Sequence, residues 1–157
     1  LMQSMASFVS QNVGAGKHKR AKQSMFTGMG VGLAVGSVVF VLVFLQGDTL
    51  SGFFTTDTAV IVRAYDYLKG FAPETLGTAI LFSMMGYFNG NNKTVFVMAQ
   101  GMIQTLLVRL PLSYYMSIQP NASLTRIGLA APISTAVGIV LCIGCYLYMQ
   151  RGEKKVQ

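Results

Sequence analysis

The chain has 157 residues, of which 52% are hydrophobic and only 11% are charged. Soluble domains carry roughly 25% charged residues, and the mean hydropathy of +0.52 also points to lipid as the solvent. The formal net charge of +7 does not predict a nucleic-acid-binding protein, because the basic residues stand in short clusters between long apolar runs. We therefore expect an integral membrane protein.

Residues 1–16 predict the end of a helix, which stops at a Gly-Ala-Gly turn before a basic cluster. This beginning is apolar and has no basic leader, so we expect the chain to be a piece of a longer protein. The string GAGK is not a phosphate-binding loop. That motif needs Gly five residues before its GK and Ser or Thr after it, whereas this chain has Gln11 and His18 there.

Apolar runs long enough to cross a bilayer, which takes about 20 residues per helix, predict transmembrane helices over residues 24–46, 71–89, 94–118 and 127–149. The fold class is therefore all-α: a polytopic membrane helix bundle with about four full transmembrane helices and the end of a fifth. Between the first two spans, residues 46–57 predict a turn and residues 58–69 an amphipathic interfacial helix.

Small residues recur every four positions in two of these spans, which favours close helix packing in lipid. The two stripes are Gly28, Gly32 and Gly36 in the first span, and Ala130, Ser134, Gly138 and Cys142 in the last.

The distribution of Lys and Arg predicts the orientation. If every apolar run crosses the membrane, eight of the 12 basic residues fall on one side: four at 17–22, Lys93 in an Asn-Gly turn, and three in the tail 150–157. Cytoplasmic loops carry this excess, so we expect a cytoplasmic C-terminus.

Polar side chains inside a span are costly and by default face the bundle interior or an aqueous cavity. The candidates for lining a substrate or ion cavity are therefore Glu74, Thr78, Tyr87, Gln100, Gln104 and Arg109. Alternatively, Arg109 reaches the lipid headgroups, Glu74 lies at the interface, and the glutamines bond neighbouring helices. A cleft with methionines and aromatic side chains such as Tyr87 would suit bulky organic cations.

No catalytic constellation or metal site is expected. Cys142 and Cys145 share one helix face, but structural zinc needs about four ligands, and the only histidine, His18, is far away in the sequence. Apart from a coupling ion, we expect no cofactor.

Four segments in chain order resemble motifs of multidrug and toxic compound extrusion (MATE) transporters. Residues 10–17 with Arg20 and Ala21 resemble a QN-x-GAG-x-x-x-RA signature, and residues 86–94 a G-x-x-x-G-x-x-x-T helix hairpin. Residues 108–112 resemble an R-x-P-L helix, and residues 128–133 the last span. The motif positions, which we expect to be structural, are Gln11, Asn12, Gly14, Gly16, Gly86, Gly90, Thr94, Pro111 and Gly128.

The resemblance implies the second of two six-helix lobes, from the end of helix eight through helix twelve. Such transporters exchange small organic cations for Na⁺ or H⁺ by rocking between two states. The implied partners are membrane lipids, the cation and a missing N-terminal lobe, and the implied location is a bacterial plasma membrane.

One departure from the family pattern concerns its tenth helix, where many members place an acidic ion-coupling residue. This chain has neutral residues there, Thr78 among them, and Glu74 lies about one turn further out. Two alternatives remain open: a lipid or polysaccharide flippase of related architecture, and a small oligomeric membrane assembly protein.

Overall fold

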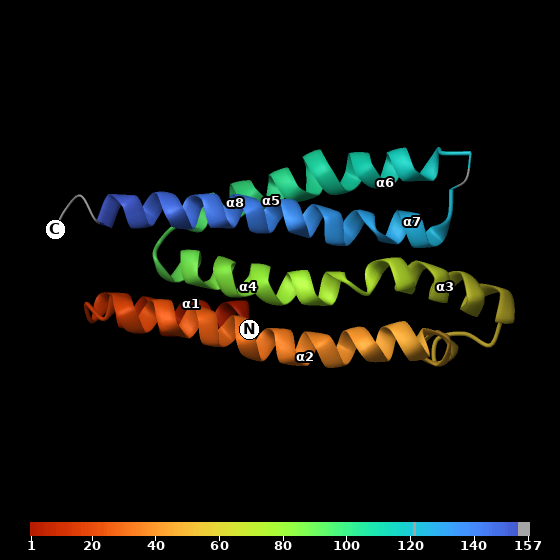
Figure 1. The fold of residues 1–157 in the computed structure, drawn as a ribbon, viewed down its shortest axis with the longest axis horizontal. Helices are drawn as coiled ribbons and strands as arrows, with labels where there is room; N and C mark the ends of the chain where they lie inside the picture. The colour runs from red at the N-terminus through yellow and green to blue at the C-terminus, as the bar shows by residue number, and fades with distance from the viewer. Residues whose placement is uncertain (121, 154–157) are drawn as a thin grey trace.

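The computed structural model describes residues 1–120 and 122–153, and all regular elements in these ranges are helical. The predicted all-α class is therefore confirmed. The helices lie side by side along the long axis of the molecule (Figure 1). In chain order they are α1 (Met2–Gly14), α2 (His18–Gly52), α3 (Thr58–Phe71), α4 (Glu74–Gly90), α5 (Thr94–Met102), the π-helix η1 (Ile103–Arg109), α6 (Leu110–Ser117), α7 (Leu124–Gly128) and α8 (Ala130–Glu153).

Within the described ranges, three helical stretches are long and apolar enough to cross a membrane: His18–Gly52, Thr94–Ser117 and Leu124–Arg151. The span expected at residues 71–89 corresponds to α4, which has 17 residues. It continues the line of α3 beyond a break at Pro73 (Figure 1). Proline lacks a backbone N–H and its ring crowds the preceding turn, so it commonly separates two helical segments.

The turn expected at residues 46–57 is wrong for its first part, because α2 remains helical to Gly52. Only Gln46 departs from helical geometry, with φ −127° and ψ 26°. Beside this kink, the Tyr65 hydroxyl donates a hydrogen bond of 2.9 Å to the carbonyl of Phe44. Gly47 leaves space for the Tyr65 ring, so α3 packs on the end of α2.

The middle layer of the bundle is α4, and small residues bring α1 and α2 close to it. A Cβ at Gly90 would lie 2.5 Å from Cβ of Val9, and a Cβ at Gly36 would lie 3.0 Å from the carbonyl oxygen of Thr75. The Thr75 hydroxyl also donates to the Gly36 carbonyl at 3.2 Å. The glycine stripe of α2 therefore serves helix packing, which in lipid depends on such close approach.

The basic segments gather at one end of the bundle. The α1–α2 turn, the α4–α5 turn and the end of α8 all lie there, whereas the α2–α3 and α6–α7 connections lie at the other end (Figure 1). Both basic turns use the left-handed region, with φ 71° at Gly16 and 58° at Asn92. Residues 154–157 of the expected tail lie outside the described residues.

Candidate functional site

A chain of side-chain hydrogen bonds connects α4, α8, η1 and α5 inside the bundle. The Gln100 amide donates to Oε1 of Gln104 at 2.7 Å, and the Gln104 amide donates to Oγ1 of Thr135 at 3.1 Å. The Thr135 hydroxyl donates in turn to Oε1 of Glu74 at 2.9 Å. We call these four residues the Glu74 network.

The side chains of the Glu74 network are largely buried. Gln100 and Thr135 are each only 1% exposed, whereas Glu74 and Gln104 are half-buried. One buried oxygen at each end of the network, Oε2 of Glu74 and Oε1 of Gln100, has no hydrogen-bond partner among the described residues. A buried acceptor without a partner costs about 1–3 kcal/mol, so these oxygens mark the place as more than packing.

Two glycines leave the space between the helices that the network side chains occupy. A Cβ at Gly138 would lie 2.5 Å from Oε1 of Gln104 and 2.6 Å from Nε2 of Gln100. A Cβ at Gly77 would lie 2.8 Å from the methyl group of Thr135. The small-residue stripe of α8 therefore provides the space that the glutamines occupy.

The π-helix η1 sets the position of Gln104, which lies within its seven residues. A π-helix inserts extra residues into a helical turn and is frequent at functional sites. Pro111 follows directly, near the start of α6, where it removes a backbone donor. The irregular backbone therefore includes Gln104 and continues to the proline, as in transporter helices that are broken near a site.

The hydrogen bonds have one direction. Each amide or hydroxyl donates toward the next residue, and the series ends on the Glu74 carboxylate. The carboxylate oxygen that takes no part in these bonds is the kind of hard ligand that small cations prefer. The network could thus hold a proton or a small cation on Glu74. Among the described residues, no group of three or more His, Cys, Asp and Glu could hold a metal ion.

Three other candidate residues lie apart from the network. Thr78 lines a cavity of about 340 Å³ between α4 and α2, together with Gly32 and Gly36. Tyr87 is buried near the basic end, in edge-to-face contact with the Tyr146 ring at 5.9 Å. Arg109 ends η1, is half-buried and takes no part in the network's hydrogen bonds.

The motif residues at the basic end lie in turns and helix contacts. The side-chain amide of Asn12 donates to the Phe8 carbonyl at 2.7 Å, and the backbone carbonyl of Asn12 accepts from the backbone N–H of Lys17 at 2.8 Å. The backbone carbonyl of Gln11 accepts from Ala15, one residue beyond Gly14, at 3.1 Å. Thr94 begins α5 after the Asn-Gly turn.

Two other motif glycines lie where helices approach closely. A Cβ at Gly86 would lie 2.7 Å from Cβ of Met5 on α1, and a Cβ at Gly128 would lie 2.6 Å from the Tyr67 carbonyl oxygen on α3. Neither glycine belongs to the Glu74 network.

The sequence reasoning missed Thr135. It singled out candidates in the earlier spans but passed over the hydroxyl groups of the last span, which can donate to the backbone of their own helix and need no other partner. The available signal was its spacing: Thr135 stands three residues before Gly138, on the same helix face as the small-residue stripe.

Comparison with known proteins gives the family. The MatE family profile matches residues 1–115. An FAD transporter of Shewanella oneidensis is 26% identical over 153 residues, which is 96% of this chain and 32% of that protein. Probable multidrug resistance proteins NorM of Bacillus thuringiensis subsp. konkukian and Bacillus anthracis are each 26% identical over 117 residues, which is 74% of this chain and 26% of theirs.

The chain thus spans about a third or less of the length of these curated relatives. No solved structure matches it significantly. Together with the apolar helices, the family match identifies an integral membrane protein. Because that match covers well over half of the chain, this protein belongs to the MATE family of membrane transporters.

Proposed function

We propose that this chain is part of the C-terminal lobe of a secondary active antiporter that exports organic cations in exchange for Na⁺ or H⁺. Membership of the MATE family and the similarity to NorM proteins support efflux. The observation that carries the ion-coupled mechanism is Glu74, an acidic residue inside the bundle with one buried, unpartnered carboxylate oxygen.

In this mechanism Glu74 carries the coupling ion. The Thr135 hydroxyl donates directly to the charged carboxylate. Behind it, the Gln104 amide donates to Thr135 and the Gln100 amide donates to Gln104. Binding of a proton or Na⁺ neutralises that charge, which weakens the hydrogen bonds between α4, α8 and η1. An ion can shift a two-state equilibrium only by its differential affinity for the two states, and we assign that difference to the Glu74 network.

The orientation and the remaining partners belong to the same proposal. The gathering of basic turns at one end of the bundle supports a cytoplasmic position for that end and for the C-terminus. Bacterial relatives support the bacterial plasma membrane as the location. An N-terminal lobe in the full-length protein, together with membrane lipids, would complete the transport path, since the curated relatives are about three times longer or more.

A second candidate cargo is FAD. The FAD transporter matches 96% of this chain, against 74% for the NorM proteins. FAD is a dianionic dinucleotide, so its export differs from that of organic cations in charge. Both cargoes therefore belong in the same assay.

The test is transport by the full-length protein in proteoliposomes. We expect efflux of a cationic dye that depends on an inward Na⁺ or proton gradient, with FAD release measured in parallel. Gradient-independent flux of both cargoes would contradict the antiporter. The variant Glu74→Gln should abolish gradient-driven efflux, whereas Asp66→Asn, which changes an acidic residue of α3 outside the Glu74 network, should preserve it.

A further inference from the structure

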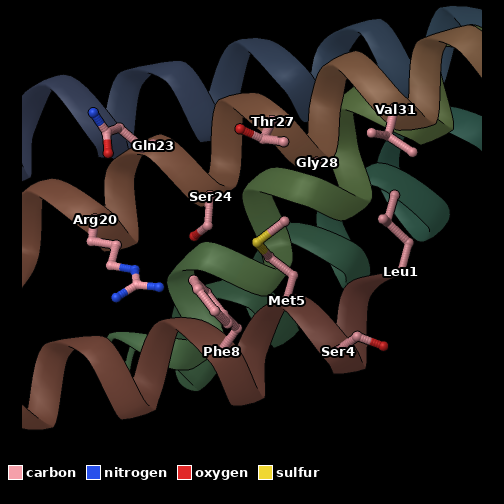
Figure 2. A pocket seen from close by; sticks show the side chains of 10 residues that line it. All are labelled: Leu1, Ser4, Met5, Phe8, Arg20, Gln23, Ser24, Thr27, Gly28 and Val31. Atoms are coloured by element: carbon pink, nitrogen blue, oxygen red, sulfur yellow. The ribbon is translucent and has the colours of Figure 1, made fainter.

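An apolar cavity of about 520 Å³ lies between α1 and α2 and is separate from the Glu74 network. Figure 2 shows its arrangement, with Arg20 and Phe8 toward one end, Leu1 and Val31 toward the other, and Met5 between them. We call this cavity the trough. Its wall on α2 includes Gly28, where the Met5 side chain approaches the backbone closely.

A second cavity of about 590 Å³ lies beside the trough at the α1–α2 turn, and Arg20 and Gln23 line both. Its other walls include Lys17 and Lys19, which are exposed together with Arg20. We call these three basic residues the rim. The Arg20 guanidinium lies 5.8 Å from the centre of the Phe8 ring, which holds its charge over the entrance of the trough.

The charge of this region has one sign. Residues 1–47, which supply every wall of both cavities, contain no Asp or Glu. The rim is therefore electrostatically complementary to an anion. Basic side chains at the cytoplasmic ends of membrane helices attract anionic headgroups with about 1 kcal/mol each.

The length of the trough along α2 matches the thickness of one leaflet. From Arg20 to Val31 the helix rises by about 16 Å at 1.5 Å per residue, which is about half of a hydrocarbon core roughly 30 Å thick. A ligand that fits must carry a negative charge at one end and an apolar chain of leaflet length at the other. Phospholipids combine these two properties within one molecule.

We propose that the rim and the trough together form a binding site for one anionic phospholipid of the cytoplasmic leaflet. Its phosphate lies against Lys17, Lys19 and Arg20, and one acyl chain lies along the trough toward Val31. The proposal rests on the orientation proposed above, with the basic end in the cytoplasm, but not on antiport or on the transported cargo. It assigns no role to Glu74.

The first experiment is native mass spectrometry of the full-length protein with equimolar phosphatidylglycerol and phosphatidylcholine of identical acyl chains. We expect retention of phosphatidylglycerol, and Arg20→Gln should lower the ratio of bound phosphatidylglycerol to phosphatidylcholine about five-fold. The matched control is Lys93→Gln, an exposed charge in the basic turn that lines neither cavity, which should leave the ratio unchanged. Equal losses in both variants would overturn the site, because they would report only the diffuse attraction of a basic surface.

The trough is tested separately from the charge. Thr27 is exposed and lines it, so Thr27→Phe should fill it and lower retention of phosphatidylglycerol while the rim stays intact. A photo-reactive p-benzoyl-phenylalanine in place of Val31 should form an adduct with the lipid in membranes that contain phosphatidylglycerol. Cross-linking only to protein would show that another part of the transporter occupies the trough, and that result would overturn the proposal.

Discussion

The Thr135 hydroxyl on α8 donates a hydrogen bond of 2.9 Å to Oε1 of Glu74, the first residue of α4. Sixty-one positions separate these two residues in the sequence. Thr135 also accepts from Gln104, so one hydroxyl group links the acidic residue to the π-helix. The hydroxyl thereby joins three helical segments at the only acidic side chain of α4.

Replacement of that hydroxyl tests its role. Thr135→Val keeps the side-chain volume but leaves Glu74 and Gln104 each without one partner. We expect the free energy of unfolding to fall by about 1–3 kcal/mol and gradient-driven efflux to fall with it. Thermal unfolding and dye transport measure the two effects. Thr78→Val, on the other side of α4, is the control, and equal losses in both variants would contradict a specific role for Thr135.

The substitution Gly138→Ala tests the network without removing any polar atom from it. The Cβ of Gly138→Ala would meet Oε1 of Gln104 and Nε2 of Gln100, so both amides must move away. Because these are the ends of flexible side chains, we expect stability within about 1 kcal/mol of the parent but markedly weaker ion coupling. Gly144→Ala, on the same helix with open space around its Cβ, should couple normally. Unchanged coupling in Gly138→Ala would show that ion coupling does not require the network.

The contact of α1 with α4 depends on Gly90. The side chain of Gly90→Leu would collide with Val9 and with the Ala6 carbonyl oxygen, which belongs to the backbone and cannot turn aside. We expect a loss of at least about 1–3 kcal/mol, the usual cost of overpacking. Unfolding of purified protein measures it. Gly30→Leu, whose Cβ would meet nothing within 4 Å, should remain near the parent, and a stable Gly90→Leu protein would refute the packing.

Cysteine labelling tests the orientation. In a background with Cys142→Ala and Cys145→Ala, we expect Lys19→Cys and Lys93→Cys to react from the cytoplasmic side only, because both lie at the basic end. Thr56→Cys, in the α2–α3 connection at the other end, should react only from outside. A membrane-impermeant maleimide applied to intact cells and to inverted vesicles gives the answer. Opposite labelling of positions 19 and 93 would refute the topology.

The sequence by itself determined the helical class, the membrane environment and the family. Long uncharged runs have no stable state in water, and in lipid only a helix satisfies their backbone groups internally. Periodic small residues also marked two packing faces, since a four-residue spacing places side chains on one side of any helix. These properties are local, so they can be read along the chain.

The tertiary structure alone decided which polar residues meet. Glu74, Thr78 and Tyr87 share α4, yet only Glu74 joins the network. Thr78 lines a cavity toward α2, and Tyr87 meets α8 near the opposite end of the helix. The length of α2 and the π-helix around Gln104 were also invisible in the sequence. Each depends on contacts with helices distant in the chain, such as Tyr65 beside the kink and Gly138 beside the glutamines, and composition carries no record of such contacts.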